Sequence, residues 1–447
     1  MKTEIIARAV PIGWETTTLG EVVKRNGGHI QTGPFGSQLH ASDYVSIGIP
    51  TVMPVNIGDN RIIEDGIFRI TESDAKRLSR HRVKQGDIIY SRRGDVERRA
   101  LVRIEQEGWL CGTGCIMVRV GHGEVDATYA SYYLGHPSVR AWIVNHAIGA
   151  TMPNLNTSIM EAIPFVVPPL KDQQAIACIL GALDDKIELN RRMNRTLEAM
   201  ARALFHDWFV DFGPVRAKAA GQAPAGLKPE IAALFPDRLV EVEGRVVPEE
   251  WDIGRLGGIA QHPRRSVRPD QIDEDMPYIA LEHMPKRCIA LSDWGTADGV
   301  ESNKYEFRTG EILFGKLRPY FHKVGVAPLD GVCSTDIVVV TPQAQHWFGL
   351  VLGHVSSDAF VEYTNAFSAG TKMPRTNWDD MSRYEIAVPS TEIAQAYTDQ
   401  VQPAVKRIAT TIHESRTLAA LRDTLLPKLI SGEVRVADAE HIVGRCL

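Results

Sequence analysis

The sequence predicts an α+β protein built from two repeated globular segments and two long helices that pair as an antiparallel coiled coil. Three observations support this. Short motifs recur in the same order in both halves of the chain. A heptad spacing of apolar residues follows each half. Between these features, short valine and isoleucine runs alternate with glycine and proline turns. The chain has 447 residues, 44% of them hydrophobic, which is enough apolar material for packed cores.

The repeat is seen in motifs that keep their order along the chain. Near its end, Gly149-x-x-Met152-Pro153 returns as Gly370-x-x-Met373-Pro374, an offset of 221 residues. Earlier matches are Pro11-x-x-Trp14 with Pro248-x-x-Trp251, Gly86-Asp-Ile-Ile with Gly310-Glu-Ile-Leu, and Leu134-Gly135-His136 with Leu352-Gly353-His354. Several matches in one order are hard to obtain by chance, so we expect two copies of one domain plan.

The copies set the expected domain boundaries. Residues 1–170 and 248–391 should be the two globular domains, since both carry short β-type runs between turns. Residues 211–247 are rich in alanine, glycine and proline and are predicted to be a connector. Residues 431–447 form a short peripheral tail.

The two long helices are predicted at 171–210 and 392–430. In the first helix, apolar residues recur at alternating intervals of four and three residues, and asparagine occupies two of these positions. Adding 221 to their residue numbers gives an equivalent series in the second helix, with polar residues at its middle; each series is called a heptad seam. Antiparallel pairing would bring the two polar layers together and fix the register. The alternative is that each helix packs only on its own globular half. The expected pairing residues are Leu180, Leu183, Ile187, Asn190, Asn194, Leu197, Val401, Ala404, Ile408, Thr411, Ser415 and Leu418.

Catalytic and cofactor motifs are not found in the sequence. The segment from Gly310 to Leu317 comes within one residue of a phosphate-binding loop, but Leu317 stands where a Mg²⁺-binding hydroxyl is needed. There is no glycine turn with an Asn/Asp-Pro-Pro-aromatic motif, as an amino-methyltransferase would need, and no hydrolase or zinc-protease signature. The six cysteines lack metal-ligand spacing. We therefore expect a binding protein without a metal or cofactor of its own.

The sequence also bears on location and partner. It has no run of about 20 apolar residues, so we expect no membrane span and a reducing, cytoplasmic setting. The net charge of −5 argues, as an average, against a nucleic-acid partner. Locally, however, ten basic and three acidic residues lie between Lys76 and Arg103. Such a run is often a solvated surface, but the second half is also basic at the equivalent place, which favours a phosphate-binding face.

Two further features lie beside this basic run. The turn from Gln31 to Ser37 carries amide and hydroxyl groups that can read bases. The Met-Pro motif is flanked by different polar residues in the two halves, which suits domains that read different sequences. The expected DNA-binding residues are Gln31, Thr32, Phe35, Ser37, Arg92, Arg93, Arg98, Arg99, Lys316, Arg318, Tyr320, Lys323, Lys372 and Arg375.

Several segments together resemble a known family. They are Thr32-Gly-Pro-Phe-Gly-Ser-Gln-Leu39, Gly86-Asp-Ile-Ile-Tyr-Ser-Arg-Arg-Gly94, Ile163-Pro-Phe-Val-Val-Pro-Pro-Leu170, Leu183-Asp-Asp-Lys-Ile-Glu-Leu-Asn190 and Leu204-Phe-His-Asp-Trp-Phe-Val-Asp-Phe212. With them the chain strongly resembles the DNA-specificity (S) subunits of type I restriction-modification systems. The helix starts Lys171-Asp-Gln-Gln174 and Ser390-Thr-Glu-Ile393 match that family only loosely.

The resemblance implies a function. The globular segments would be target recognition domains, each binding half of a bipartite site in double-stranded DNA. The helices would act as a spacer and hold two methyltransferase subunits, and restriction/motor subunits would join for cleavage. S-adenosylmethionine, ATP and Mg²⁺ would bind to those partners. The alternatives are a stand-alone DNA methyltransferase or nuclease, and a structural adaptor without DNA contact.

The length of the first long helix can be compared with the spacing of major-groove turns in DNA. A helix from Asp172 to Phe209 spans about 57 Å at ~1.5 Å per residue. Successive turns of the DNA major groove are ~34 Å apart. We therefore expect a split site with an unread gap between its halves.

Overall fold

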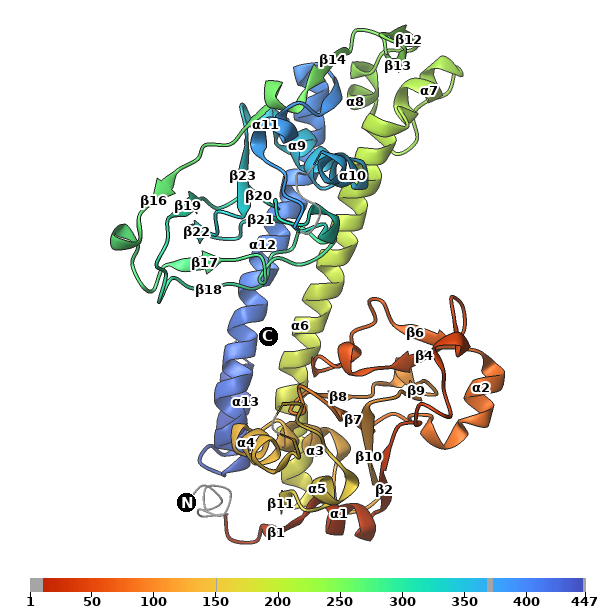
Figure 1. The fold of residues 1–447 in the computed structure, drawn as a ribbon, viewed down its shortest axis with the longest axis vertical. Helices are drawn as coiled ribbons and strands as arrows, with labels where there is room; N and C mark the ends of the chain where they lie inside the picture. The colour runs from red at the N-terminus through yellow and green to blue at the C-terminus, as the bar shows by residue number, and fades with distance from the viewer. Residues whose placement is uncertain (1–10, 150, 368–372, 445–447) are drawn as a thin grey trace. The chain divides into compact units, whose positions relative to one another are not determined.

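The computed structural model describes residues 11–149, 151–367 and 373–444, and the chain divides into two compact units. Unit 1 comprises Met1–Lys186 and Leu418–Leu447, and unit 2 comprises Ile187–Thr417. Each unit holds one globular domain together with part of both long helices (Figure 1). Each domain mixes helices with sheets, which confirms the predicted fold class.

The globular domain of unit 1 is organised around a five-stranded sheet in the order β2-β10-β7-β8-β5. All four residues of β7 are buried, as is most of β10, so these strands form the centre of the domain. The strands are β2 (Gly27–Thr32), β5 (Asp59–Asn60), β7 (Ile88–Ser91), β8 (Arg99–Leu101) and β10 (Cys115–Gly121).

Smaller sheets and short helices complete this domain. A four-stranded sheet has the order β3-β6-β4-β9, and β1 pairs antiparallel with β11. The remaining strands are β1 (Glu15–Thr18), β3 (Tyr44–Val45), β4 (Ile49–Val52), β6 (Phe68–Ile70), β9 (Leu110–Cys111) and β11 (Pro164–Val167). The helices are α1 (Leu19–Arg25), α2 (Glu72–Arg77), α3 (Ala127–Leu134), α4 (Pro137–His146), α5 (Thr157–Glu161) and, in the tail, α13 (Val436–Val443).

The globular domain of unit 2 repeats this plan. Its four-stranded sheet runs β15-β23-β20-β21, the same order as β2-β10-β7-β8, and β14 pairs with β24 as β1 pairs with β11. A five-stranded sheet has the order β16-β19-β22-β17-β18. The strands are β14 (Asp252–Arg255), β15 (Ala260–Gln261), β16 (Ser266–Val267), β17 (Pro277–Ile279), β18 (Gly295–Thr296), β19 (Lys304–Phe307), β20 (Ile312–Gly315), β21 (Val324–Val326), β22 (Gly331–Cys333), β23 (Ile337–Pro342) and β24 (Glu385–Val388).

Three helices of unit 2 have counterparts in unit 1, and the last pair begins in the same way. The helices α9 (Phe348–Val355), α10 (Asp358–Ala366) and α11 (Trp378–Ser382) correspond to α3, α4 and α5. The side chains of Asn156 and Asn377, 221 residues apart, accept a backbone N–H and cap α5 and α11. The sequence repeat is therefore a repeat of local structure.

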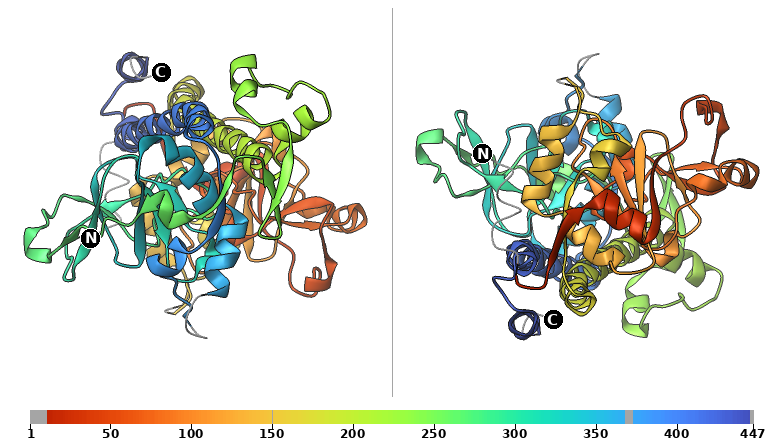
Figure 2. Two further views of the ribbon diagram at one scale, coloured as in Figure 1. Left: turned by 90° about the horizontal axis from the view of Figure 1, so that it is seen from above. Right: turned by 90° about the horizontal axis from the view of Figure 1, so that it is seen from below.

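The long helices are α6 (Leu170–Phe205), which continues through a π-helical turn at His206–Val210, and α12 (Thr391–Ile430). They run side by side when viewed along their length (Figure 2). In unit 2, Asn194 Oδ1 accepts a hydrogen bond from the Thr411 hydroxyl at 2.6 Å, and Asn190 donates to Ser415 at 3.2 Å. Because residue numbers rise along one helix as they fall along the other, the helices are antiparallel.

Most of the expected pairing residues are buried, and hydrogen bonds between the two helices are made by Asn190 with Ser415 and by Asn194 with Thr411. Leu180, Leu183, Ile187, Asn190, Asn194, Val401, Ile408, Thr411 and Leu418 are buried, while Leu197, Ala404 and Ser415 are partly buried. Val405 and Ile412, which the heptad reading passed over, are also buried, because α12 packs against its globular domain as well as against α6.

The segment 211–247 has regular structure of its own. It contains α7 (Gly213–Ala219), α8 (Pro229–Leu234) and a hairpin of β12 (Leu239–Val242) and β13 (Arg245–Pro248). Phe212, Val215 and Phe235 are buried in the core of unit 2. In the described part of the chain, no helix has the length and apolar character needed to cross a membrane.

Candidate nucleic-acid interface

In unit 1, the turn that follows β7 is held by backbone hydrogen bonds on both sides. Arg92 N–H donates to Gly114 at 2.8 Å, and Gly94 N–H donates to Pro153 at 3.0 Å. Gly94 has a φ of +76°, a conformation that disfavours other residue types. Arg93 therefore stands exposed at the tip of a turn tied to the Met-Pro loop.

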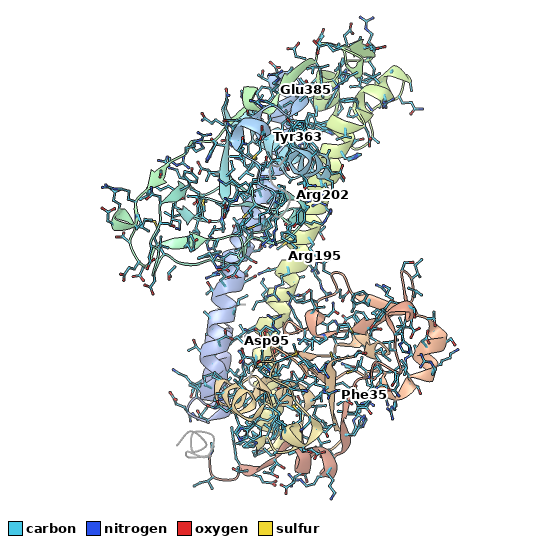
Figure 3. The ribbon with its side chains drawn as sticks, viewed as in Figure 1. Phe35, Asp95, Arg195, Arg202, Tyr363 and Glu385 are labelled. Carbon is cyan, nitrogen blue, oxygen red and sulfur yellow. The ribbon has the colours of Figure 1, made fainter. Side chains whose placement is uncertain are left out.

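The loop after β2 lies beside this turn. Phe35, labelled in Figure 3, is 54% exposed. Its ring centroid lies 5.8 Å from the Arg92 guanidinium. The loop is closed by Gln38, whose side chain accepts the Phe35 N–H at 3.1 Å. Ser37 is exposed, and Thr32 is partly exposed at the end of β2. An exposed aromatic ring next to an arginine suits contact with bases and phosphates.

A basic pocket of about 560 Å³ opens near β2 in the same unit. Its lining includes Arg80, Lys84, Arg119 and His29, with Glu107 at its edge. Burial lowers the pKa of His29, and Arg119 lowers it further, so this imidazole is neutral at pH 7. Gln31 also lines the pocket, where its amide donates to the Arg80 carbonyl and fixes that backbone.

The charge of the basic run is divided between surface and interior. Lys76, Arg80, Lys84 and Arg93 are exposed. Others pair with acids: Arg77 with Asp74, Arg82 with Glu72, Arg98 with Asp95 and Arg103 with Asp185. The expected phosphate-binding face is therefore less positive than the sequence count suggests.

The structure corrects one member of the expected DNA-binding residues, Arg99. Its side chain is only 6% exposed and donates to the Ser131 carbonyl at 2.5 Å. Arg99 lies in β8 beside buried β7, and its guanidinium lies against Gly135 of the adjoining helix end. It is therefore a structural residue that cannot contact DNA.

Unit 2 repeats the turn of unit 1 with other side chains. Arg318 N–H donates to Pro374 at 2.8 Å, the counterpart of Gly94 and Pro153. Arg318 takes a φ of +51°, and Lys316 stands where the first domain has Arg92. Arg375 pairs with Asp336 at 3.3 Å. Lys372 lies outside the described residues.

Two further expected residues follow this turn. Tyr320 is exposed, and its ring contacts that of Phe321 at a tilted angle, with the centroids 4.7 Å apart. Lys323 is partly buried and donates to the Leu281 carbonyl. Burial lowers the pKa of Lys323, and the nearby Lys286 lowers it further.

The sequence reading missed several basic residues at this surface. Arg119 lies within the apolar strand β10, where alternation could have marked it as facing away from the core, and its guanidinium pairs with the buried carboxylate of Asp87. In unit 2, Arg264 and Arg268 lie on the segment equivalent to the Phe35 loop, and both are exposed. The equivalence follows from strand pairing, since β15 and β2 pair alike with β23 and β10.

No metal site stands out in the described residues. Across 11–149, 151–367 and 373–444, histidine, cysteine and carboxylate side chains do not form groups of three that could hold an ion. Both units instead place cations and an exposed aromatic ring at or beside the turn, and such groups can contact phosphates and bases.

The chain is similar to known proteins. A family model described as the type I restriction modification DNA specificity domain matches residues 11–199. The chain is 25% identical to the HindI specificity subunit of Haemophilus influenzae, over 86% of this chain and 95% of that protein. It is 23% identical to the MjaIX specificity subunit of Methanocaldococcus jannaschii, over 96% of this chain and 95% of that protein. The crystal structure of a type I restriction-modification S subunit from M. genitalium aligns with a TM-score of 0.55 at 13% identity, covering 94% of this chain and 96% of that one.

Proposed function

The chain belongs to the DNA-specificity subunits of type I restriction-modification systems, and we propose that each of its two globular domains binds one half of a bipartite, asymmetric DNA site. It is the non-catalytic subunit that recognises DNA sequence. Methylation and cleavage belong to the methyltransferase and restriction subunits with which such subunits assemble. We propose two methyltransferase subunits per chain, one for each domain, with S-adenosylmethionine, ATP and Mg²⁺ bound by the partners.

The proposal for two half-sites rests on one observation. The same hydrogen bond ties the turn to the Met-Pro loop in both units, from Gly94 to Pro153 and from Arg318 to Pro374. The side chains on this shared backbone differ, since Arg92 and Arg93 are replaced by Lys316 and Leu317. The two domains thus hold different side chains on the same backbone turn. Each domain can then recognise a different base sequence in the same orientation, as an asymmetric site requires.

Mapping of methylated adenines in the native genome tests the proposal. We expect one split motif whose methylation disappears when this chain is deleted. Replacing residues 1–170 with the same region of another specificity subunit should change one half of the motif and preserve the other. A change in both halves would contradict independent reading.

The stand-alone enzyme makes the opposite prediction. A methyltransferase or nuclease would bind S-adenosylmethionine or ATP without help from another subunit. We expect isothermal titration of the purified chain with either molecule to give no binding. Saturable binding to this polypeptide alone would overturn the assignment of the cofactors to the partners.

A further inference from the structure

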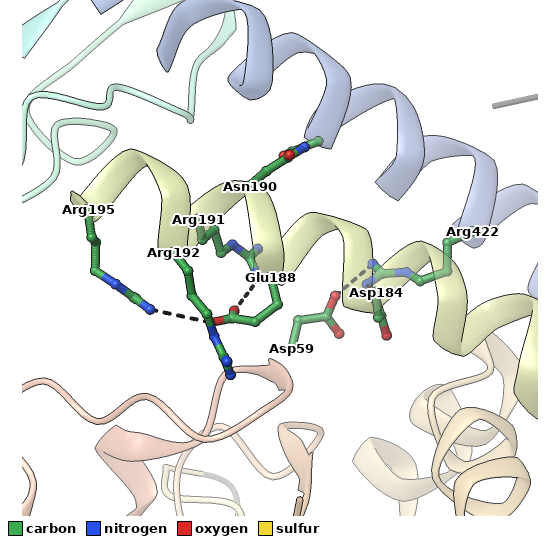
Figure 4. Close-up of polar contacts among 9 residues, drawn as sticks. Asp59, Asp184, Glu188, Asn190, Arg191, Arg192, Arg195 and Arg422 are labelled. Carbon is green, nitrogen blue, oxygen red and sulfur yellow. Dashed lines mark hydrogen bonds and ion pairs between the residues drawn. The ribbon is translucent and has the colours of Figure 1, made fainter. Parts of the chain in front are cut away.

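The first long helix carries a row of arginines within unit 2. Arg191, Arg192 and Arg195 lie on α6 and share one carboxylate, Glu188, at 3.8, 3.4 and 3.5 Å (Figure 4). Arg202 follows seven residues after Arg195, so it lies on the same side of the helix. This arginine row faces away from the seam, because Asn190, Asn194 and Leu197 occupy the opposite side.

This arrangement is costly for the helix by itself. Like charges three or four residues apart repel each other, and Arg191, Arg192 and Arg195 stand at those spacings. Their side chains are 42%, 60% and 63% exposed, and the contacts to Glu188 are long. Ion pairs of this kind contribute little to stability. The row is therefore better suited to an external anion than to holding the helix together.

The last arginine of the row lies near the turn of the second globular domain. Arg202 Nη2 donates to the Arg287 carbonyl at 3.5 Å, and Arg287 N–H donates to His322 at 2.9 Å. His322 ends the short turn that begins after Arg318. Lys286 lies 4.8 Å from the ring of Phe321 in that turn. Arg202 therefore lies close to the turn after β20, while Arg287 itself pairs with Asp358 at 2.7 Å, and all of these residues belong to unit 2.

We propose that Arg191, Arg192, Arg195 and Arg202 bind the phosphate backbone of DNA next to the half-site read by the second domain. This inference rests on the proposed function and adds a contact that carries no base information. The planar guanidinium binds phosphate through two parallel N–H groups, so an arginine row suits a sugar-phosphate backbone. The nearness of Arg202 to the turn after β20 favours DNA over an acidic protein partner.

The experiment compares the wild-type chain with the double variant Arg192→Gln/Arg195→Gln. The chain is purified with its methyltransferase subunits. Binding is measured on a duplex containing the mapped methylation motif and on a mixed-sequence duplex, between 50 and 200 mM salt. Glutamine keeps helix propensity, so the fold should persist, and far-UV circular dichroism melts verify this. The control Lys406→Gln/Arg407→Gln removes the same charge from exposed positions on α12 in the same unit.

Each phosphate contact contributes about 0.9 to the magnitude of the slope of log affinity against log salt concentration. The double variant, which loses two such contacts, should therefore have a slope that is shallower by about 1.8. The advantage of the wild type over the variant should then shrink about 12-fold between 50 and 200 mM salt, equally on both duplexes. The α12 control should keep the wild-type slope.

Three outcomes would count against the inference. In the first, the wild type binds its motif and the arginine variant has the same salt dependence of affinity as the wild type. This result would overturn this inference and leave the proposed function standing. An arginine variant that keeps the slope but no longer co-purifies with the methyltransferase subunits would make the row a protein-docking surface and refute phosphate binding. A wild type that binds no duplex would refute the proposed function and this inference together.

Discussion

The buried arginine of the second long helix allows a stability prediction within unit 1. Arg422 is 12% exposed and donates to Asp184 on α6 at 2.6 Å and to Asp59 in the globular domain at 2.8 Å. Tyr132 of α3 donates its hydroxyl to the other oxygen of Asp184 at 2.6 Å. Both the partner helix and the domain are therefore attached to α12 through one guanidinium.

Replacing Arg422 with methionine should destabilise unit 1 strongly. Asp184, only 13% exposed, would lose its cation and remain buried as a charge. Removing one partner of a buried pair costs about 3–5 kcal/mol. We expect a value near 3 kcal/mol, since Asp59 is largely exposed and can be hydrated again. Urea unfolding followed by circular dichroism measures the loss, and hydrogen exchange of α3 locates it in unit 1.

The repeat supplies the compensating variant. At the positions equivalent to Asp184 and Tyr132, unit 2 has Val405 and Leu350, both buried and apolar. Adding Asp184→Val and Tyr132→Phe to Arg422→Met should therefore restore most of the lost stability, because apolar replacement of a buried pair is often neutral. A single variant that costs less than about 1 kcal/mol, or a triple variant no more stable than the single one, would refute this reasoning.

Other predictions concern pH, the reading loop and the spacer. Burial lowers the pKa of His354 to about 3, so between pH 6.5 and 3 the unfolded chain binds this proton and the folded chain does not. The stability therefore decreases as the pH decreases through this range, by up to about 1.4 kcal/mol per pH unit. His354→Leu should flatten this dependence in urea unfolding at pH 4 to 6, and an unchanged slope would be inconsistent with a neutral buried imidazole. Phe35→Ala should weaken binding by about 1–3 kcal/mol, if the ring stacks on a base, and only for duplexes carrying the first half-site. Equal weakening on all duplexes would contradict a role for Phe35 in reading the first half-site. Removing one heptad from each long helix shortens each by about 10 Å and should reduce the gap by about three base pairs with both half-sites unchanged. Methylation mapping that returns the original gap would exclude the spacer role.

The sequence predicted those parts of the fold that depend on local periodicity. The heptad seam identified Leu180, Leu183 and Ile187, because a helix that buries one face must repeat apolar residues at that spacing. The Gly-x-x-Met-Pro motif marked the loop that supports each turn, because both the turn and its hydrogen bond depend on the local chain.

The sequence could not show which charges the fold would bury or pair. Arg98 and Arg99 are neighbours in the chain, yet Arg98 pairs with Asp95 at the surface and Arg99 is enclosed. Alternate residues of a strand face opposite ways, so the two depend on a strand register that was not known beforehand. The contact between Arg202 on α6 and the Arg287 carbonyl likewise depends on tertiary packing, which the helical spacing of the arginines does not reveal.

The polar layer and the buried arginine together specify which helices pair. Asn190 and Thr411 are equivalent by the repeat, as are Asn194 and Ser415, so the layer looks nearly the same from either helix. That symmetry alone would also permit pairing between two copies of α6. In such a pair, Asp184 would face Ala201, the residue equivalent to Arg422, and would be buried without a cation. Since a buried unpaired carboxylate costs several kcal/mol, we infer that the Asp184–Arg422 contact selects α12 as the partner of α6, while the asparagine layer sets the register.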